Sequence, residues 1–207
     1  MSHACDNFQL TNHTIAMSHL LNNLLNEVNG TATRQLGLHL NTSEEETQQA
    51  LGSALPLLLQ SLAKKTREDN PDLIRNQVNA QQQGALNLRD LSDLIKGNGQ
   101  TDLVQILLGN KRNRAEEYIS KDSGMSRSKV SQLLAMAAPL VLQYLAKRKQ
   151  EQNADPVDEL HEFESEFGQQ HPKSRNVFER LLDQDNDGDI TDDLMNIGKT
   201  MFRSFVK

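Results

Sequence analysis

Apolar residues recur every three or four positions over much of the chain, which is the spacing of one face of an α-helix. The segment 43–68 shows this spacing at Leu51, Leu55, Leu58, Leu59 and Leu62. The segment 126–151 shows it again, at Leu134, Ala138, Val141, Leu142 and Leu145. Shorter amphipathic segments lie at 17–30 and 101–111, and no segment has a convincing strand pattern. We therefore predict an all-α fold.

The two long segments are copies of one another. They align without gaps, and twelve of their 26 aligned positions are identical. Both copies carry a proline at the same place, Pro56 and Pro139, and an interior proline kinks or breaks a helix. In the first copy, Ser43 and Glu46 have the spacing of a capping box, which marks a helix start. We infer an internal duplication with two equivalent long helices.

Residues 115–134, AEEYISKDSGMSRSKVSQLL, follow the register of a helix-turn-helix unit with Gly124 at the turn. Asn41 takes the turn position in the first copy. Such a unit can place its second helix in the major groove of DNA, where Arg127 and Lys129 would make the contacts. The corresponding helix of the first copy begins Ser-Glu-Glu-Glu, however, and DNA phosphates would repel it. We therefore interpret the turns as helix packing, with a DNA-binding regulator as the alternative.

The segment 181–194, LLDQDNDGDITDDL, crowds six aspartates together. Two carboxylates a few ångströms apart repel by up to about 4 kcal/mol, so a cation is expected among them. The spacing matches a calcium loop, which uses oxygens at positions 1, 3 and 5, Gly at 6 and a backbone carbonyl at 7. The predicted ligands of calcium (Ca²⁺) are Asp183, Asp185, Asp187, the carbonyl of Asp189, and Asp192 or Asp193.

The end of this loop departs from the usual pattern. Position 12 is Leu194, where calcium loops have a bidentate Glu, so Asp192 or Asp193 must substitute. These two aspartates also suit the N-terminus of a helix without any metal, which is the alternative interpretation. Amphipathic segments flank the loop, and residues 174–207 are predicted to form a helix-loop-helix.

The composition narrows the function classes. The chain has 207 residues, 36% apolar and 4% aromatic with no Trp, so its core must be aliphatic. A net charge of −6 gives no general attraction to nucleic acid or to an anionic membrane. The single cysteine, Cys5, excludes an internal disulfide framework. The sequence shows no signal peptide and no apolar run long enough to span a bilayer, so we expect a cytoplasmic protein.

The chain divides into four parts. We predict a loose N-terminus at 1–14, a duplicated helical domain at 15–151, an acidic linker at 152–173 and the helix-loop-helix at 174–207. The linker prediction depends on the many acids, prolines and glutamines of this stretch. One solvated helix is expected within it, around 157–167.

The sequence resembles the bacterial YidB-like family, known as domain of unknown function 937. The resemblance covers roughly residues 16–151, and its clearest mark is LLGNKRNRAEEYISKDSGMSRSKVSQLLAMAAPLVLQYLAKRK. It implies an irregular helical bundle with duplicated halves and homeodomain-like turns. Many members end in a similar aspartate-rich segment. The family has no established activity, and this chain is richer in Gln and poorer in Gly than expected of a member.

The resulting functional hypothesis is a non-enzymatic, calcium-binding helical protein that serves as a protein-interaction or scaffold module. Its partner would be a protein of unknown identity, and we expect neither nucleic acid nor a membrane. An enzyme is not expected because the histidines have no partnered Cys, Ser motif or carboxylate pair. The segment GNGQ at 97–100 also lacks the Gly-Lys-Ser/Thr of a phosphate loop.

Overall fold

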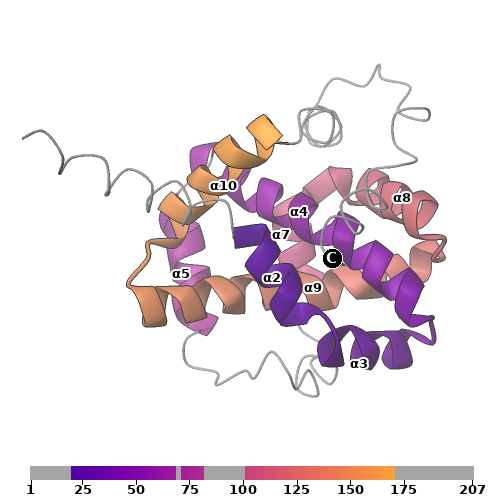
Figure 1. Cartoon of the computed structure of the whole chain (residues 1–207). Coiled ribbons are helices and arrows are strands. Elements are labelled where there is room, and N and C mark those ends of the chain that lie inside the picture. Colours follow the sequence, from indigo (N-terminus) through magenta and orange to yellow (C-terminus); the bar gives the residue numbers. More distant parts are fainter. Residues whose placement is uncertain (1–19, 69–70, 82–100, 171–207) are drawn as a thin grey trace, which may run out of the picture.

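The computed structural model describes residues 20–68, 71–81 and 101–170, and all regular elements in these ranges are helical (Figure 1). The helices are α2 (Leu20–Val28), α3 (Thr31–Leu40), α4 (Glu44–Glu68), α5 (Pro71–Gln81), α7 (Thr101–Leu108), the short 3₁₀ helix η1 (Gly109–Lys111), α8 (Arg112–Ser123), α9 (Arg127–Gln152) and α10 (Pro156–Gln170). The predicted all-α class is confirmed. The aspartate loop, the helix-loop-helix at 174–207 and the N-terminal residues 1–14 lie outside the described residues.

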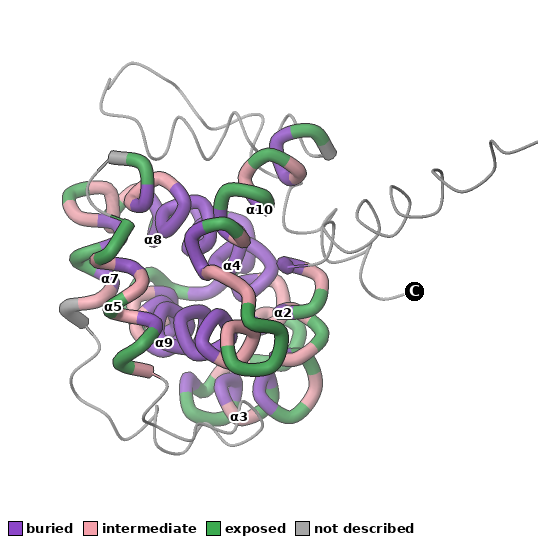
Figure 2. The backbone as a smooth tube through the Cα atoms, turned by 90° about the vertical axis from the view of Figure 1, so that its left-hand side faces the viewer, coloured by how far each residue is buried: buried purple, intermediate pink, exposed green. Residues whose placement is uncertain are grey.

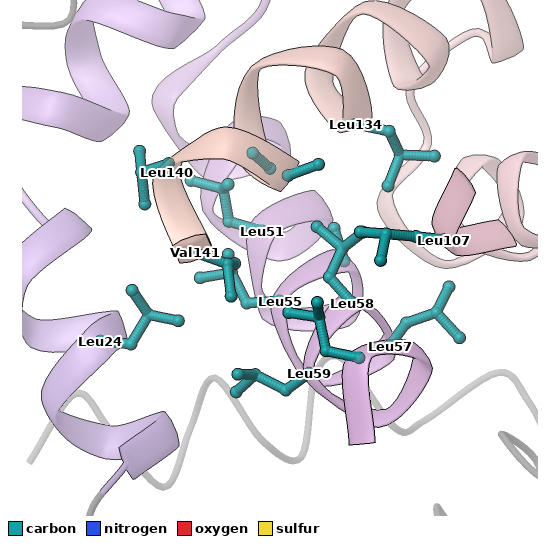
Figure 3. Packing of buried hydrophobic residues seen from close by; sticks show 14 of the residues in the cluster. Leu24, Leu51, Leu55, Leu57, Leu58, Leu59, Leu107, Leu134, Leu140 and Val141 are labelled. Carbon is teal, nitrogen blue, oxygen red and sulfur yellow. The ribbon is translucent and has the colours of Figure 1, made fainter. Parts of the chain in front are cut away.

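The two long helices, α4 and α9, form the centre of the bundle. They pack against each other, and the shorter helices surround them. Figure 2 shows buried residues along both helices and exposed residues on the outer sides of the bundle. In Figure 3, leucines of α4 meet Leu134, Leu140 and Val141 of α9, with Leu24 of α2 and Leu107 of α7 beside them. The core is aliphatic, because most of these side chains are Leu, Val or Ala.

Helix α9 passes a simple test for a membrane span by its length and composition, but 78% of its most apolar window is buried inside the bundle. Both long helices continue through their prolines, Pro56 and Pro139. A complete break at these positions is therefore excluded. Each ring is buried, and packing against the core compensates for the backbone hydrogen bond that the proline cannot donate.

The helix ends follow the predicted local signals. Ser43 and Glu46 form the capping box: the Glu46 N–H donates to Ser43 Oγ at 3.1 Å, and the Ser43 N–H donates to Glu46 Oε2 at 3.0 Å. The Ser43 N–H and the Ser43 hydroxyl, which also donates to Glu46 Oε2 at 3.0 Å, lower the pKa of Glu46. Asn41 ends α3 and Gly124 ends α8, and both have left-handed backbones, with φ of 52° and 78°. Asn and Gly are the residues that adopt this conformation at least cost.

The helix expected around 157–167 within the predicted acidic linker is present, but the structure corrects its predicted solvation. Residues 156–170 form α10, which packs on α4, α5 and α9 instead of being solvated. Its buried face is Val157, Leu160, Phe163 and Phe167, and the two Phe rings lie 5.3 Å apart. These four residues have helical spacing, but the acids between them gave the segment the composition of a linker.

Candidate functional site

The six aspartates of the predicted calcium site, Asp183, Asp185, Asp187, Asp189, Asp192 and Asp193, all lie outside the described residues. The calcium site therefore stays a prediction from sequence. Within the described part, two places where several helices bring polar and charged side chains together are candidates for a functional site. One is the pair of helix junctions that the DNA-binding alternative requires, and the other is a groove beside α9.

The two helix junctions lie next to each other. Gln49, near the start of α4, donates from Nε2 to the carbonyl oxygen of Asp122 in α8 at 2.7 Å. Lys129, in the first turn of α9, donates from Nζ to the carbonyl oxygen of Asn41 at 2.5 Å. The start of α4 thus contacts the end of α8, the helix before α9. The start of α9 contacts the residue that ends α3, the helix before α4. The two would-be recognition helices therefore begin on the same side of the molecule.

This arrangement places the basic start of α9 beside the acidic start of α4. The first turn of α4 carries Glu44, Glu45 and Glu46, and the charge of Lys129 adds to the Ser43 hydrogen bonds in lowering the pKa of Glu46. Arg127 donates to the carbonyl oxygen of Asn113 at 3.1 Å. A DNA phosphate that approached these two cations would also meet the three glutamates, which repel it. The geometry weighs against the DNA-binding alternative.

A buried polar contact holds α8 against α4. Ser53 Oγ donates to Asp122 Oδ2, and both residues are buried. Tyr118 lies close by, and burial together with the charge of Asp122 raises the pKa of its phenol. None of the three lines the groove described next. We therefore assign this cluster to helix packing.

A polar groove with a volume of about 590 Å³ lies between α2, the start of α3 and the C-terminal part of α9. Its lining is Asn23, Asn26, Glu27, Asn29, Thr31, Ala32, Tyr144, Lys147, Arg148, Glu151 and Gln152. Asn23, Asn26 and Gln152 are exposed. Their amides can both donate and accept hydrogen bonds, so this surface can bind a peptide backbone or other neutral polar groups.

The groove's basic residues are already paired with acids. Lys147 forms an ion pair with Glu27 of α2. The Arg148 guanidinium lies 2.5 Å from Glu159 Oε1 of α10, and it also lies over the ring of Tyr144, 5.9 Å from its centroid. Burial raises the pKa of Glu159, although Arg148 opposes this shift. The two cations of the groove are thus balanced by acids of other helices rather than directed at a ligand.

Sequence reasoning missed this groove. In the sequence, Lys147 and Arg148 stand out only as basic residues near the end of a predicted helix, where cations are favoured. The ion pair between Glu27 and Lys147 joins residues separated by 120 positions, and no local pattern marks such a contact. A weak signal was present at Lys147, which is identical to Lys64 in the aligned first copy.

The comparison with known families gives one match. A model of the family described as bacterial protein of unknown function (DUF937) matches residues 22–148. The match begins in α2 and ends in the last part of α9, so it includes both helix junctions and most of the groove. It leaves out α10 and the aspartate segment. No curated protein and no solved structure matches the chain.

Proposed function

The chain belongs to the DUF937 family of bacterial proteins of unknown function, and we propose that it is a non-enzymatic, calcium-binding protein-interaction module. One observation carries the interaction part: the groove beside α9 presents exposed amides next to two cations, Lys147 and Arg148, that are each already held in an ion pair. A surface of this kind offers hydrogen bonds to a partner without an unpaired lysine or arginine that requires neutralisation.

The pairing also supports a non-enzymatic role. A general acid or base must be within reach of its substrate's proton and have a pKa suited to the transfer. In the groove, Lys147 and Arg148 are held by Glu27 and Glu159. Recognition is the chemistry that such a surface supports best.

Calcium binding is proposed from the spacing at 181–194. Asp183, Asp185 and Asp187 would provide side-chain oxygens and Asp189 its backbone carbonyl, in the order that calcium loops use. The ion would hold the two flanking amphipathic segments together as the helix-loop-helix predicted for 174–207. Its role would be to stiffen the C-terminal part or to expose an apolar surface there.

We also propose that the helical domain consists of two duplicated helix-turn-helix halves, as in the YidB-like members of the family. The sequence alignment makes Asn41 equivalent to Gly124, and both have left-handed backbones at the same point before a long helix. The reciprocal contacts of Gln49 and Lys129 are consistent with two halves that interlock.

The interaction function can be tested by affinity capture with the full chain. Immobilised wild-type protein, an Asn26→Lys variant in the groove and a Gln105→Lys variant on the exposed side of α7 would be incubated with host lysate, with and without a calcium chelator. The proposal predicts a protein that is captured by wild type and by Gln105→Lys and lost with Asn26→Lys. The same proteins captured by all three would contradict a role for the groove.

A further inference from the structure

Helix α10 packs on a surface of α4, α5 and α9 that is apolar at its centre and carries arginines at its edge. We call this surface the seat, and its arginines the basic rim. The apolar face of α10 is buried at Leu160, Phe163 and Phe167 to 4% exposure or less. Three arginines from three different helices pair with its acids: Arg67 of α4 with Glu164, Arg75 of α5 with Asp155, and Arg148 of α9 with Glu159. The nitrogen–oxygen distances in these three pairs are 2.8, 3.0 and 2.5 Å, in the same order.

The charges of the two surfaces are complementary. Between Asp155 and Gln170 the helix and its cap carry six acids and no lysine or arginine, whereas all three partners on the seat are arginines. Arginine offers a planar set of donors that suits carboxylates. The seat is therefore built for a helix of defined chemistry: amphipathic, with aromatic and branched aliphatic residues on one face and acids at its edges.

The seat and its occupant belong to different parts of the chain. All three arginines lie within residues 22–148, the part that matches the family, and α10 lies outside it. Only residues 153–155 connect α9 to α10, and Asn153 has a left-handed backbone, with φ of 54°. The family domain thus contains a complete helix-binding surface that an appended helix fills.

We propose that this seat is a docking site for an acidic amphipathic helix of a partner protein, and that α10 occupies it in cis until the partner displaces it. The inference rests on the proposed interaction function and names the chemistry of the partner. The partner helix would match the spacing of α10, with apolar residues equivalent to Val157, Leu160, Phe163 and Phe167.

Two of the three ion pairs that hold α10 suit reversible docking, whereas the third, Arg148–Glu159, is more buried, with side chains 16% and 11% exposed. The side chains of the Arg67–Glu164 pair are 53% and 24% exposed, and those of the Arg75–Asp155 pair are each 36% exposed. Ion pairs this exposed contribute little each and weaken with salt. A partner helix still competes with a tethered one, whose effective concentration is on the order of millimolar, so the partner must bind the seat more tightly than α10 does.

Arg148 links the seat to the polar groove. It lines the groove and at the same time pairs with Glu159 of α10. A carboxylate that bound Arg148 from the groove would compete with Glu159 and loosen α10.

The test uses a fluorescently labelled peptide of residues 155–170, DPVDELHEFESEFGQQ, and fluorescence anisotropy. The peptide is titrated with wild-type full chain and with a Leu160→Ala/Phe163→Ala full chain, in which the cis helix is weakened and the seat is unchanged. We expect binding to the variant at least tenfold tighter than to wild type. Adding Arg67→Ala and Arg75→Ala to the variant should remove most of this binding, and a peptide with Leu160→Ala and Phe163→Ala should not bind.

Failure of the peptide to bind the variant, while circular dichroism shows an intact helical fold, would overturn the proposal. If the variant does not fold, hydrogen exchange of the wild-type chain decides instead. Amides of α10 should exchange faster than those of α4 and α9, and equal protection would contradict a displaceable helix. A dimer with exchanged α10 helices would assign the seat to a second copy and contradict a separate partner. It would be detected as an intermolecular disulfide in a Cys5→Ser/Arg67→Cys/Glu164→Cys variant.

This experiment is independent of the groove and calcium tests. If the peptide does not bind but groove-dependent capture is observed, the docking proposal for the seat is rejected and the proposed interaction function is retained. If the peptide binds but capture does not depend on the groove, the docking proposal is retained and the role of the groove is rejected.

Discussion

Lys129, in the first turn of α9, donates a hydrogen bond to the carbonyl oxygen of Asn41, the left-handed residue that ends α3. The two residues are 88 positions apart in sequence. With the reciprocal contact from Gln49 to Asp122, this bond joins the two helix junctions. It also places the basic start of α9 beside the acidic start of α4. An anion that approaches the cations of α9 therefore also meets the glutamates of α4.

The first prediction concerns DNA. Because Glu44, Glu45 and Glu46 begin α4 next to Lys129, the wild-type full chain should not be retained on duplex DNA or heparin at about 50 mM salt, where phosphate contacts are strong. An Arg127→Glu/Lys129→Glu variant should behave like wild type. Retention of wild type that is lost in this variant would establish the DNA-binding alternative instead.

The second prediction concerns the junction before α9. Gly124 has a φ of +78°, which a branched side chain adopts only at a cost of about 1–2 kcal/mol. Gly124→Val should therefore lower the free energy of unfolding by about that amount. Gly124→Asn should cost clearly less, because Asn41 holds the same conformation at the equivalent place.

Urea unfolding monitored by circular dichroism measures both Gly124 variants. The converse change, Asn41→Gly, is the matched control in the other half and should leave the stability nearly unchanged. Equal losses for Gly124→Val and Gly124→Asn would show that the left-handed backbone is not what this position requires.

The third prediction concerns pH and the start of α10. Burial of Asp155 opposes its ionisation, but hydrogen bonds from Arg75 and from the Val157 N–H outweigh this and lower its pKa below the ordinary 3.8. The folded state therefore binds this proton less tightly than the unfolded state. The resulting stabilisation is complete above the unfolded pKa and is lost as the pH falls through the folded one.

The free energy of unfolding of wild type and of Asp155→Asn should accordingly differ most at neutral pH. The difference should shrink as the pH falls through the lowered pKa of Asp155 in the folded state, because the carboxyl then becomes protonated in both states. Taking the difference between the two proteins removes the contributions of other acids, including Glu159, whose raised pKa acts in the opposite direction. A difference that grows on acidification would contradict the contacts assigned to Asp155.

Local features of the fold could be predicted from sequence. Leucine spacing located α4 and α9, and the capping box at Ser43 and Glu46 forms as expected. The turn at Asn41 also has the left-handed backbone that its alignment with Gly124 indicated. These features depend on residues within a few positions of each other, so the local pattern contains the necessary information.

The packing of α10 and the groove could not be predicted in the same way. Glu164 and Asp155 find their arginines about a hundred positions away, at Arg67 and Arg75. Without knowledge of the basic rim, the acids of α10 indicated solvation rather than docking. The groove likewise requires α2 to lie beside α9, which the ion pair between Glu27 and Lys147 joins across the sequence.

The most direct test of the central claim is isothermal titration of the full chain with calcium. The predicted loop uses the side chains of Asp183 and Asp187 but only the backbone carbonyl of Asp189. Wild type and Asp189→Ala should therefore bind one calcium ion with similar affinity, and Asp183→Ala/Asp187→Ala should give no binding heat. Equal heats from wild type and the double variant, or no heat from wild type, would contradict calcium binding at this loop.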